Sequence, residues 1–405
     1  MNLYLERYAY PQQQLHSMPA AGTELIIVIP CYKEKALMKT ISSLRNCTLP
    51  SHHTEVIIVF NGSDNDSEEI NKINKDSIGE FERWVSTQEF KNITFHSICC
   101  FELPRKHAGV GLARKIGMDE AVRRFEMLGN KNGVILCTDA DTLFPKNYLI
   151  EISNYFFAQP KIQACSIHYE HPIDQENSEE IIAYELHLRY YIEALRHAGH
   201  PHAYHTIGSS MAVRSLAYQQ QGGMNKRKAG EDFYFLHKLI PNGNFGEITR
   251  THTIPSPRLS DRVPFGTGKA MNDQIKQETE LLTYHPKIFD DLKLFLQQIP
   301  SLYTQDAKQL PDSVALFLNE QYFTEIVNNI RRHSSSASIF TNRFYRWFNG
   351  FKVLKYTHLA RDCFYPNITI STAAAMLIEE KELNTKELLL YYREIQKRHS
   401  AHWST

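Results

Sequence analysis

The sequence lacks long apolar runs. A membrane-spanning helix needs roughly 18 to 20 consecutive apolar residues, and the strand-like runs Leu25–Pro30 and Val56–Phe60 are far shorter. Residues 1–22 carry Glu6 and Arg7 among polar residues and have no apolar centre of the kind that a signal peptide requires. We therefore expect a cytoplasmic protein without a spanning segment.

The sequence also has no excess of charge of either sign. Lys plus Arg and Asp plus Glu both number 45 in 405 residues, so the formal net charge is zero. This balance does not favour a nucleic acid as partner, because proteins that bind nucleic acid usually carry a basic excess. The seven cysteines are odd in number and lack the spacing of metal ligands. We expect them to be reduced thiols.

Short β-branched runs alternate with helical patterns between residues 25 and 167. The runs that predict strands are Leu25–Ile29, Glu55–Phe60, Thr94–Cys99, Val134–Cys137 and Ile162–Ile167. The patterns that predict helices are Glu34–Asn46, Asp66–Lys75, Ala108–Leu128 and Lys146–Ala158. Such alternation predicts βαβ units, and hence an α/β domain with a mostly parallel sheet flanked by helices. Small residues recur along one face of Ala108–Leu128, which predicts that this helix packs close to the sheet.

Beyond residue 286 the pattern changes to Leu, Phe and Tyr at helical spacing, without strong strands. We expect an N-terminal extension over residues 1–23, a catalytic domain over 24–285 and a helical C-terminal accessory region over 286–405. In the last region Ile339–Leu359 mixes aromatic with basic residues. This pattern is typical of a helix lying peripherally on the inner face of a membrane. It is more often found where an accessory region packs on its neighbour, and Asn349-Gly350 would interrupt a single helical face.

Two carboxylates, one residue apart, follow the apolar run Val134–Cys137. Asp139 and Asp141 should therefore lie at the carboxyl edge of the sheet, where α/β folds bind ligands. Hard oxygen ligands at this edge suit Mg²⁺ or Mn²⁺ held together with phosphate groups. The pattern indicates chemistry on a nucleotide diphosphate.

Polar residues also follow the first two predicted strands. The first strand is expected to break at Pro30, and the loop after it presents Tyr32 and Glu34. The second is followed by Asn61, whose amide can donate to and accept from the edge of a base. Each joint taken by itself is equally typical of an ordinary turn after a strand.

Five motifs, taken in order, resemble the family 2 glycosyltransferases of GT-A fold. They are Pro30-Cys31-Tyr32-Lys33-Glu34, Asn61-Gly62-Ser63, Ala113-Arg114-Lys115-x-Gly117, Asp139-Ala140-Asp141 and Gly230-Glu231-Asp232. The resemblance covers roughly residues 24–255 and does not extend beyond about residue 290. It implies a Rossmann-like, mostly parallel nucleotide-binding sheet. It also implies transfer of a sugar from a nucleotide-diphosphate sugar to an acceptor hydroxyl on a glycan, a lipid-linked glycan or a small metabolite.

The resemblance further implies roles for single residues. Those expected to contact the nucleotide are Pro30, Tyr32, Glu34, Asn61, Lys106 and Asp139. Asn61 stands where many family members have an Asp that reads the base, so a uridine donor is favoured while guanosine stays open. Asp139 and Asp141 would hold the divalent cation, Mn²⁺ or Mg²⁺, with His252 as a further ligand.

Glu231 and Asp232 follow Gly230 at the start of a predicted helix. Acids in a first turn are ordinarily explained by the helix dipole. The resemblance instead implies that Asp232 is the catalytic base of an inverting transfer and that Glu231 lies nearer the acceptor. A retaining transferase of the same fold and a sugar-phosphate nucleotidyltransferase are alternative enzymes, although Pro30–Glu34 lacks the glycine-rich signature of the latter. A degenerate nucleotide-binding scaffold is the non-enzymatic alternative.

Overall fold

The computed structural model describes residues 2–174, 178–257 and 280–401. Within them the chain forms two compact units. The chain passes between the units at Pro172–Ile173, at His205–Thr206 and at Gln396–Lys397. The boundary predicted at residue 286 differs from this division, because residues 178–205 belong to the second unit rather than to the sheet. Residues 2–23, predicted as a separate extension, belong to the first unit.

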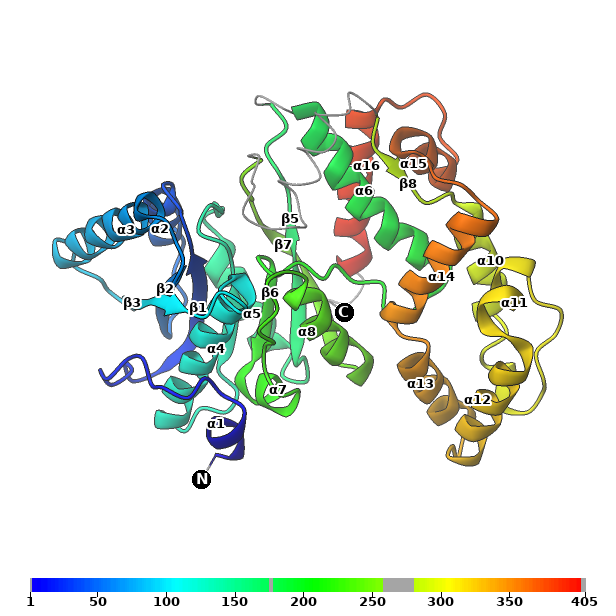
Figure 1. The fold of residues 1–405 in the computed structure, drawn as a ribbon, viewed down its shortest axis with the longest axis horizontal. Coiled ribbons are helices and arrows are strands. Elements are labelled where there is room, and N and C mark those ends of the chain that lie inside the picture. The colour runs from blue at the N-terminus through cyan, green and yellow to red at the C-terminus, as the bar shows by residue number, and fades with distance from the viewer. Residues whose placement is uncertain (1, 175–177, 258–279, 402–405) are drawn as a thin grey trace. The chain divides into compact units, whose positions relative to one another are not determined.

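The first unit is built on a seven-stranded sheet of order β3-β2-β1-β4-β6-β5-β7 (Figure 1). Its strands are β1 (Thr23–Cys31), β2 (His53–Ser63), β3 (Ile93–Leu103), β4 (Val134–Cys137), β5 (Ala164–Tyr169), β6 (Met211–Arg214) and β7 (Phe245–Thr253). Only β6 runs against its neighbours, so the predicted α/β class with a mostly parallel sheet is confirmed. The carboxyl ends of all these strands except β6 therefore meet at one edge.

The helices of the first unit precede or connect these strands. A short 3-10 turn, η1 (Ile240–Asn242), follows the last of these helices. They are α1 (Leu3–Arg7), α2 (Leu37–Arg45), α3 (Glu68–Ser86), α4 (Val110–Met127), α5 (Tyr148–Ala158), α7 (Ser215–Gln220) and α8 (Glu231–Leu239). The close packing predicted for α4 is confirmed. A Cβ on Gly117 would come within 2.4 Å of Val28 Cγ1 on β1 and 2.9 Å of Val59 Cγ2 on β2.

Pro30 does not end the first strand, contrary to the prediction. β1 continues to Cys31, and Pro30 pairs with Val59 of β2. The other neighbour, β4, ends opposite Val28. Pro30 therefore pairs with β2 but not with β4. A residue without an N–H is tolerated where a strand has a partner on one side only.

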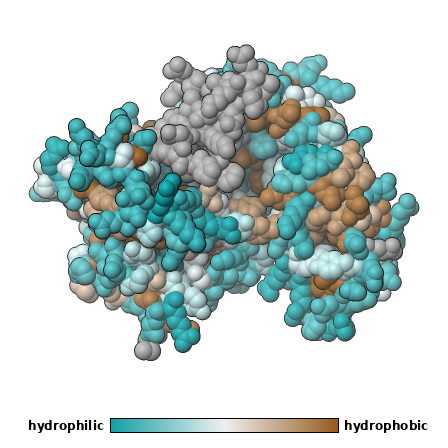
Figure 2. All heavy atoms as spheres, viewed as in Figure 1, coloured by the Kyte–Doolittle hydropathy of each residue, from teal (hydrophilic) through white to brown (hydrophobic). Residues whose placement is uncertain are grey.

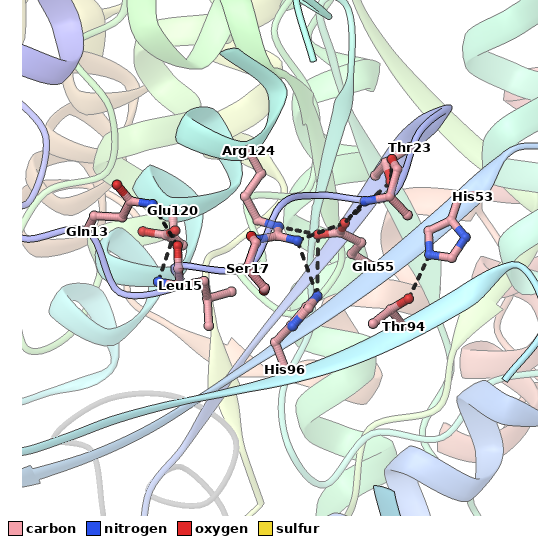
Figure 3. A network of polar contacts seen from close by, with 11 residues as sticks. Gln13, Leu15, Ser17, Thr23, His53, Glu55, Thr94, His96, Glu120 and Arg124 are labelled. Carbon is pink, nitrogen blue, oxygen red and sulfur yellow. Dashed lines mark hydrogen bonds and ion pairs between the residues drawn. The ribbon is translucent and has the colours of Figure 1, made fainter. Parts of the chain in front are cut away.

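The N-terminal segment is bound to α4 by buried charges. Glu120 accepts the N–H groups of Gln14 and Leu15 at 3.0 and 3.2 Å, and Arg124 donates to the Ser17 carbonyl at 2.9 Å. Arg124 also pairs with Glu55 of β2 (Figure 3). Glu120 and Arg124 therefore hold residues 14–17 against α4 in the first unit.

The second unit is helical, which confirms the predicted C-terminal helical region. Its helices are α6 (Ser178–His197), α10 (Lys287–Leu296), α11 (Asp312–Leu318), α12 (Glu320–Arg332), α13 (Ala337–Trp347), α14 (Gly350–Cys363), α15 (Ile370–Ile378) and all but the end of α16 (Thr385–Ala401). A 3-10 turn, η2 (Ser301–Tyr303), and the strands β8 (Leu282–Thr283) and β9 (Ile368–Thr369) complete it. In the view of Figure 2 apolar residues reach the surface over these helices, while the first unit is mainly hydrophilic.

Several aromatic residues of 339–359 are buried inside the second unit. Phe340, Phe344 and Phe348 are at most 1% exposed and belong to its apolar core. They are not available to enter a membrane. The predicted interruption is confirmed, since Asn349 caps α14 by accepting the N–H groups of Phe351 and Lys352. Among the described residues, no helix is both long and apolar enough to cross a bilayer.

Candidate functional site

The candidate site lies at the carboxyl edge of the sheet in the first unit. β2, β1 and β4 are adjacent and parallel, so the segments at their ends meet. This brings Asn61, Tyr32 and Asp139 to one edge, as the sequence predicts. Lys106 is exposed in the turn between β3 and α4, at the next strand along the same edge.

At the β2 end of this edge a buried polar atom has no partner. Asn61 is 3% exposed, and its Oδ1 accepts no hydrogen bond from the described residues. Leaving such an acceptor unsatisfied costs about 1 to 3 kcal/mol, and buried exceptions of this kind call for an explanation such as a ligand.

Asp66 lies beside Asn61 and was not found by sequence analysis. Its Oδ1 accepts the Tyr32 hydroxyl at 3.0 Å, and its Oδ2 accepts the Ser63 N–H at 2.8 Å. The carboxylate thus fixes the tyrosine that was predicted to contact the nucleotide. The surrounding Ser-Asp-Asn-Asp-Ser composition is typical of a turn and gave no signal of this role.

Glu34 is turned into its own loop. The residue is 1% exposed, and its Oε1 accepts the Ala36 N–H at 2.6 Å while its carbonyl accepts the Ser77 hydroxyl at 2.7 Å. Lys33 has a positive φ of 50° and donates its N–H to Asn74 at 2.9 Å. These bonds hold the loop after β1 in one conformation. The predicted contact of Glu34 with a nucleotide stays a prediction.

A buried arginine joins the two acidic motifs. Arg114, in the first turns of α4, is 4% exposed; its Nη2 donates to Asp139 Oδ1 at 2.5 Å, and its Nη1 donates to Glu231 Oε1. The Asp139 side chain is 39% exposed and that of Glu231 is 2% exposed. Such burial against Arg114 does not favour the predicted contact of Glu231 with an acceptor.

Two glycines allow this close assembly. A Cβ on Gly111 would come within 2.2 Å of the Arg227 carbonyl, and one on Gly208 within 2.3 Å of Arg114 Nη1. The Gly208 N–H donates to Asp232 Oδ2 at 2.8 Å. Asp232 itself is half-buried at the start of α8. The predicted base therefore stands in the same cluster as Asp139, although 93 residues separate their numbers.

Charge in this cluster is unbalanced towards the acids. Burial lowers the pKa of Arg114, but Asp139, Glu231 and Asp232 outweigh it and raise the pKa above its ordinary value. Burial raises the pKa of Glu231, and Arg114 opposes this while Asp232 and Asp139 add to it. Arg114 thus stays charged and is the cation that makes three neighbouring carboxyl groups tolerable.

The structure brings the Asp139–Asp141 loop to the end of β7. Leu143 and Ile254 exchange two backbone hydrogen bonds of 2.9 Å, two residues beyond Asp141 and His252 respectively. His252 lies in β7 opposite His168 of β5. Even so, no three His, Cys, Asp or Glu side chains of the described residues are grouped as metal ligands. His252 is therefore not assembled with the two aspartates into a ready-made site.

Two aspartates still fit a divalent cation of the predicted kind. Mg²⁺ is usually held by one or two carboxylates together with substrate phosphates and water, not by a cage of protein ligands. Arg114 binds one oxygen of Asp139, and that side chain is partly exposed. The donor set of Asp139 and Asp141 suits this mode of binding.

Comparison with known proteins identifies a family for much of the first unit. Residues 26–221 match glycosyl transferase family 2. Similar solved structures include S. aureus TarS 1–349 in complex with UDP-GlcNAc, with 13% identity, 93% of this chain and 89% of that chain covered and a TM-score of 0.41. The same protein in complex with UDP gives 12% identity, 84% and 91% coverage and a TM-score of 0.39. These scores are too low to transfer residue roles. No curated protein matches the chain.

Proposed function

Because residues 26–221 belong to glycosyl transferase family 2, the chain is a glycosyltransferase, and we propose that it moves a sugar from UDP to an acceptor hydroxyl with inversion. The observation that carries this proposal is the cluster of Asp139, Arg114, Glu231 and Asp232 at the sheet edge. It combines a partly exposed carboxylate for the donor with a second carboxylate on a different element. A single reaction centre can lie between them.

The donor base is proposed to lie against Asn61 and Tyr32. Uracil offers an N3–H donor beside a carbonyl acceptor, and the Asn61 amide offers the complementary pair. Its Oδ1 is the buried acceptor that no described residue satisfies. The TarS complexes with UDP and UDP-GlcNAc are consistent with uridine but do not carry the argument.

Asp139 and Asp141 are proposed to hold Mn²⁺ or Mg²⁺ on the donor diphosphate. Such a cation would neutralise charge that develops on the leaving group. Asp139 is held in place by Arg114, which leaves its second oxygen for the cation. We keep His252 as a proposed auxiliary ligand, because the Leu143–Ile254 bridge brings its strand to the same loop.

Asp232 is proposed to take the proton from the acceptor hydroxyl as that oxygen attacks the anomeric carbon. Its Oδ2 accepts the Gly208 N–H and its Oδ1 accepts the Phe233 N–H. These bonds orient the carboxylate before the acceptor arrives.

Replacing Asp232 by Asn tests the role of the base. The change keeps the side-chain shape but removes the basic oxygen, so we expect turnover of a UDP-sugar to fall about 10²- to 10⁴-fold. Binding of UDP with Mn²⁺, measured by calorimetry, should change less than about twofold. Asp76→Asn, at an exposed position of α3, is the matched control and should keep full turnover. Unchanged turnover in Asp232→Asn would remove this residue from the role, and a retained product anomer by NMR would contradict inversion.

A further inference from the structure

We propose that Arg114 is a positioning residue, whose fork of two N–H groups holds Asp139 and Glu231 in a fixed arrangement and so aligns the donor and acceptor sides of the site. The proposal rests on the proposed glycosyl transfer. It goes beyond that function by assigning a positioning role to Arg114, whose described ion pairs are with Asp139 and Glu231. The two carboxylates lie on different elements, and the guanidinium is their shared partner.

The geometry of the cluster favours a fork over a simple charge. Arg114 reaches Asp139 with Nη2 and Glu231 with Nη1, so each carboxylate takes a different nitrogen of one rigid plane. A lysine carries the same charge on a single nitrogen and does not reproduce this geometry. A Cβ at position 208 would come within 2.3 Å of Nη1, so the glycine leaves the space that the guanidinium occupies.

The position of Arg114 also connects it to the proposed base. Glu231 is the chain neighbour of Asp232, and both begin α8. Gly208, which packs against the guanidinium, donates its N–H to Asp232. A shift of Arg114 would therefore move Asp139 on one side and the Glu231–Asp232 turn on the other.

Two substitutions separate the charge from the fork. Arg114→Lys keeps the charge and loses the fork, while Arg114→Gln loses both. We expect kcat for a UDP-sugar to fall at least tenfold in each. The loss should appear in kcat, whereas KM for the UDP-sugar should change less than about twofold, because Arg114 is assigned the alignment of two carboxylates and not a contact with the donor.

Arg123→Lys is the matched control on the same helix. Arg123 donates to the Tyr10 carbonyl, away from the site, and its replacement should leave kcat and KM unchanged. Full turnover in Arg114→Lys would overturn the proposal, because the positive charge alone would then be sufficient. A rise in KM with unchanged kcat in the two Arg114 variants would overturn it as well.

A double-mutant cycle tests the interaction between Arg114 and Glu231 without measuring turnover. The free energy of unfolding is measured by urea for the original chain, Arg114→Gln, Glu231→Gln and the double variant. We expect the double variant to be less destabilised than the sum of the two single variants, since each single change leaves a buried partner unpaired. Additive effects would overturn the link. If the effects of the Arg114 and Glu231 variants are not additive but the original chain transfers no sugar, the interaction between these residues is supported and the proposed function is refuted.

Discussion

At the scale of single residues, buried charges in the first unit join segments that are distant in sequence. Arg114 pairs with Asp139 and Glu231, and Arg124 pairs with Glu55. A charge removed from water is tolerated only when an opposite charge and further hydrogen bonds compensate for the lost hydration. Each such pair therefore fixes the register between two elements as well as satisfying the charges.

Glu55 gives a pH-dependent prediction. Burial raises its pKa, but hydrogen bonds from His96 and Arg124 and their charges outweigh burial and lower the pKa to about 2. Because the folded-state pKa lies below the ordinary value, the stabilisation is complete above about pH 4.5 and is lost as the pH falls towards 2. We expect this one carboxylate to account for about 3 kcal/mol of the acid loss of stability.

The measurement is the free energy of unfolding by urea between pH 6 and about pH 2.5. In Glu55→Gln the slope of that free energy against pH should be smaller by the contribution of this group. Glu89→Gln, an exposed position before β3, is the control and should follow the original chain. Equal slopes in Glu55→Gln and the original chain would contradict the assignment.

At the scale of elements, α4 is the part of the chain on which the site depends. Its first turns carry Arg114, its middle packs on β1 and β2 through Gly117, and its later turns hold the N-terminal segment through Glu120 and Arg124. The sequence predicted the helix and its small-residue face, because periodicity is a local property. It did not predict the role of Arg114, since that depends on how far α4 approaches the sheet.

The same limit explains the N-terminal segment. Residues 1–23 were predicted as a separate extension, because they show neither a strand nor a long helix. Their partners, Asp119, Glu120 and Arg124, lie about 100 residues later and are buried in α4, where Figure 3 shows Glu120 and Arg124. Polar groups in an irregular segment give no periodic signal, so this contact could not be read from the sequence.

Gly117→Ala tests the packing of α4. In a helix interior this change normally stabilises by about 1 kcal/mol. Here the new Cβ would meet Val28 Cγ1 at 2.4 Å, and overpacking of stiff β-branched side chains costs about 1 to 3 kcal/mol. We expect overpacking to win and the free energy of unfolding to fall by up to about 2 kcal/mol.

Gly79→Ala in α3 is the matched control, because a Cβ there meets nothing within 4 Å. It should stabilise by about 0.5 to 1 kcal/mol in the same urea titration. The double variant Val28→Ala, Gly117→Ala should be destabilised by less than the sum of the two single variants, because Val28→Ala removes the methyl group that the new Cβ meets. Stabilisation by Gly117→Ala would show that α4 does not pack as described.

At the scale of the whole molecule, each unit has its own apolar core. The core of the first unit contains Ile27, Ile58 and Leu136, and that of the second contains Leu186 and Phe289. The predicted catalytic domain of residues 24–285 included α6, which carries Leu186. Its packing partners α10 and α15 follow about 100 residues or more later, so its membership of the second unit could not be predicted.

Two cores predict two unfolding transitions, and tryptophan fluorescence can separate them. Trp84 packs with Phe90 and Phe95 in the first unit, and Trp347 packs with Phe323 and Phe344 in the second. Trp403 lies outside the described residues and is replaced by Phe in both reporter chains. Trp347→Phe then leaves Trp84 as the reporter of the first unit, and Trp84→Phe leaves Trp347 as the reporter of the second.

The described residues of the proposed site all belong to the first unit, so ligand should stabilise only that transition. UDP with Mn²⁺ at 100 times the dissociation constant adds about 2.7 kcal/mol to the unit that binds it. We expect the Trp84 transition to move to higher urea and the Trp347 transition to stay, because a ligand stabilises only the cooperative unit whose folded state it recognises. Equal shifts in both reporters would show that the two cores unfold as one, and a shift of Trp347 alone would place the nucleotide site in the helical unit.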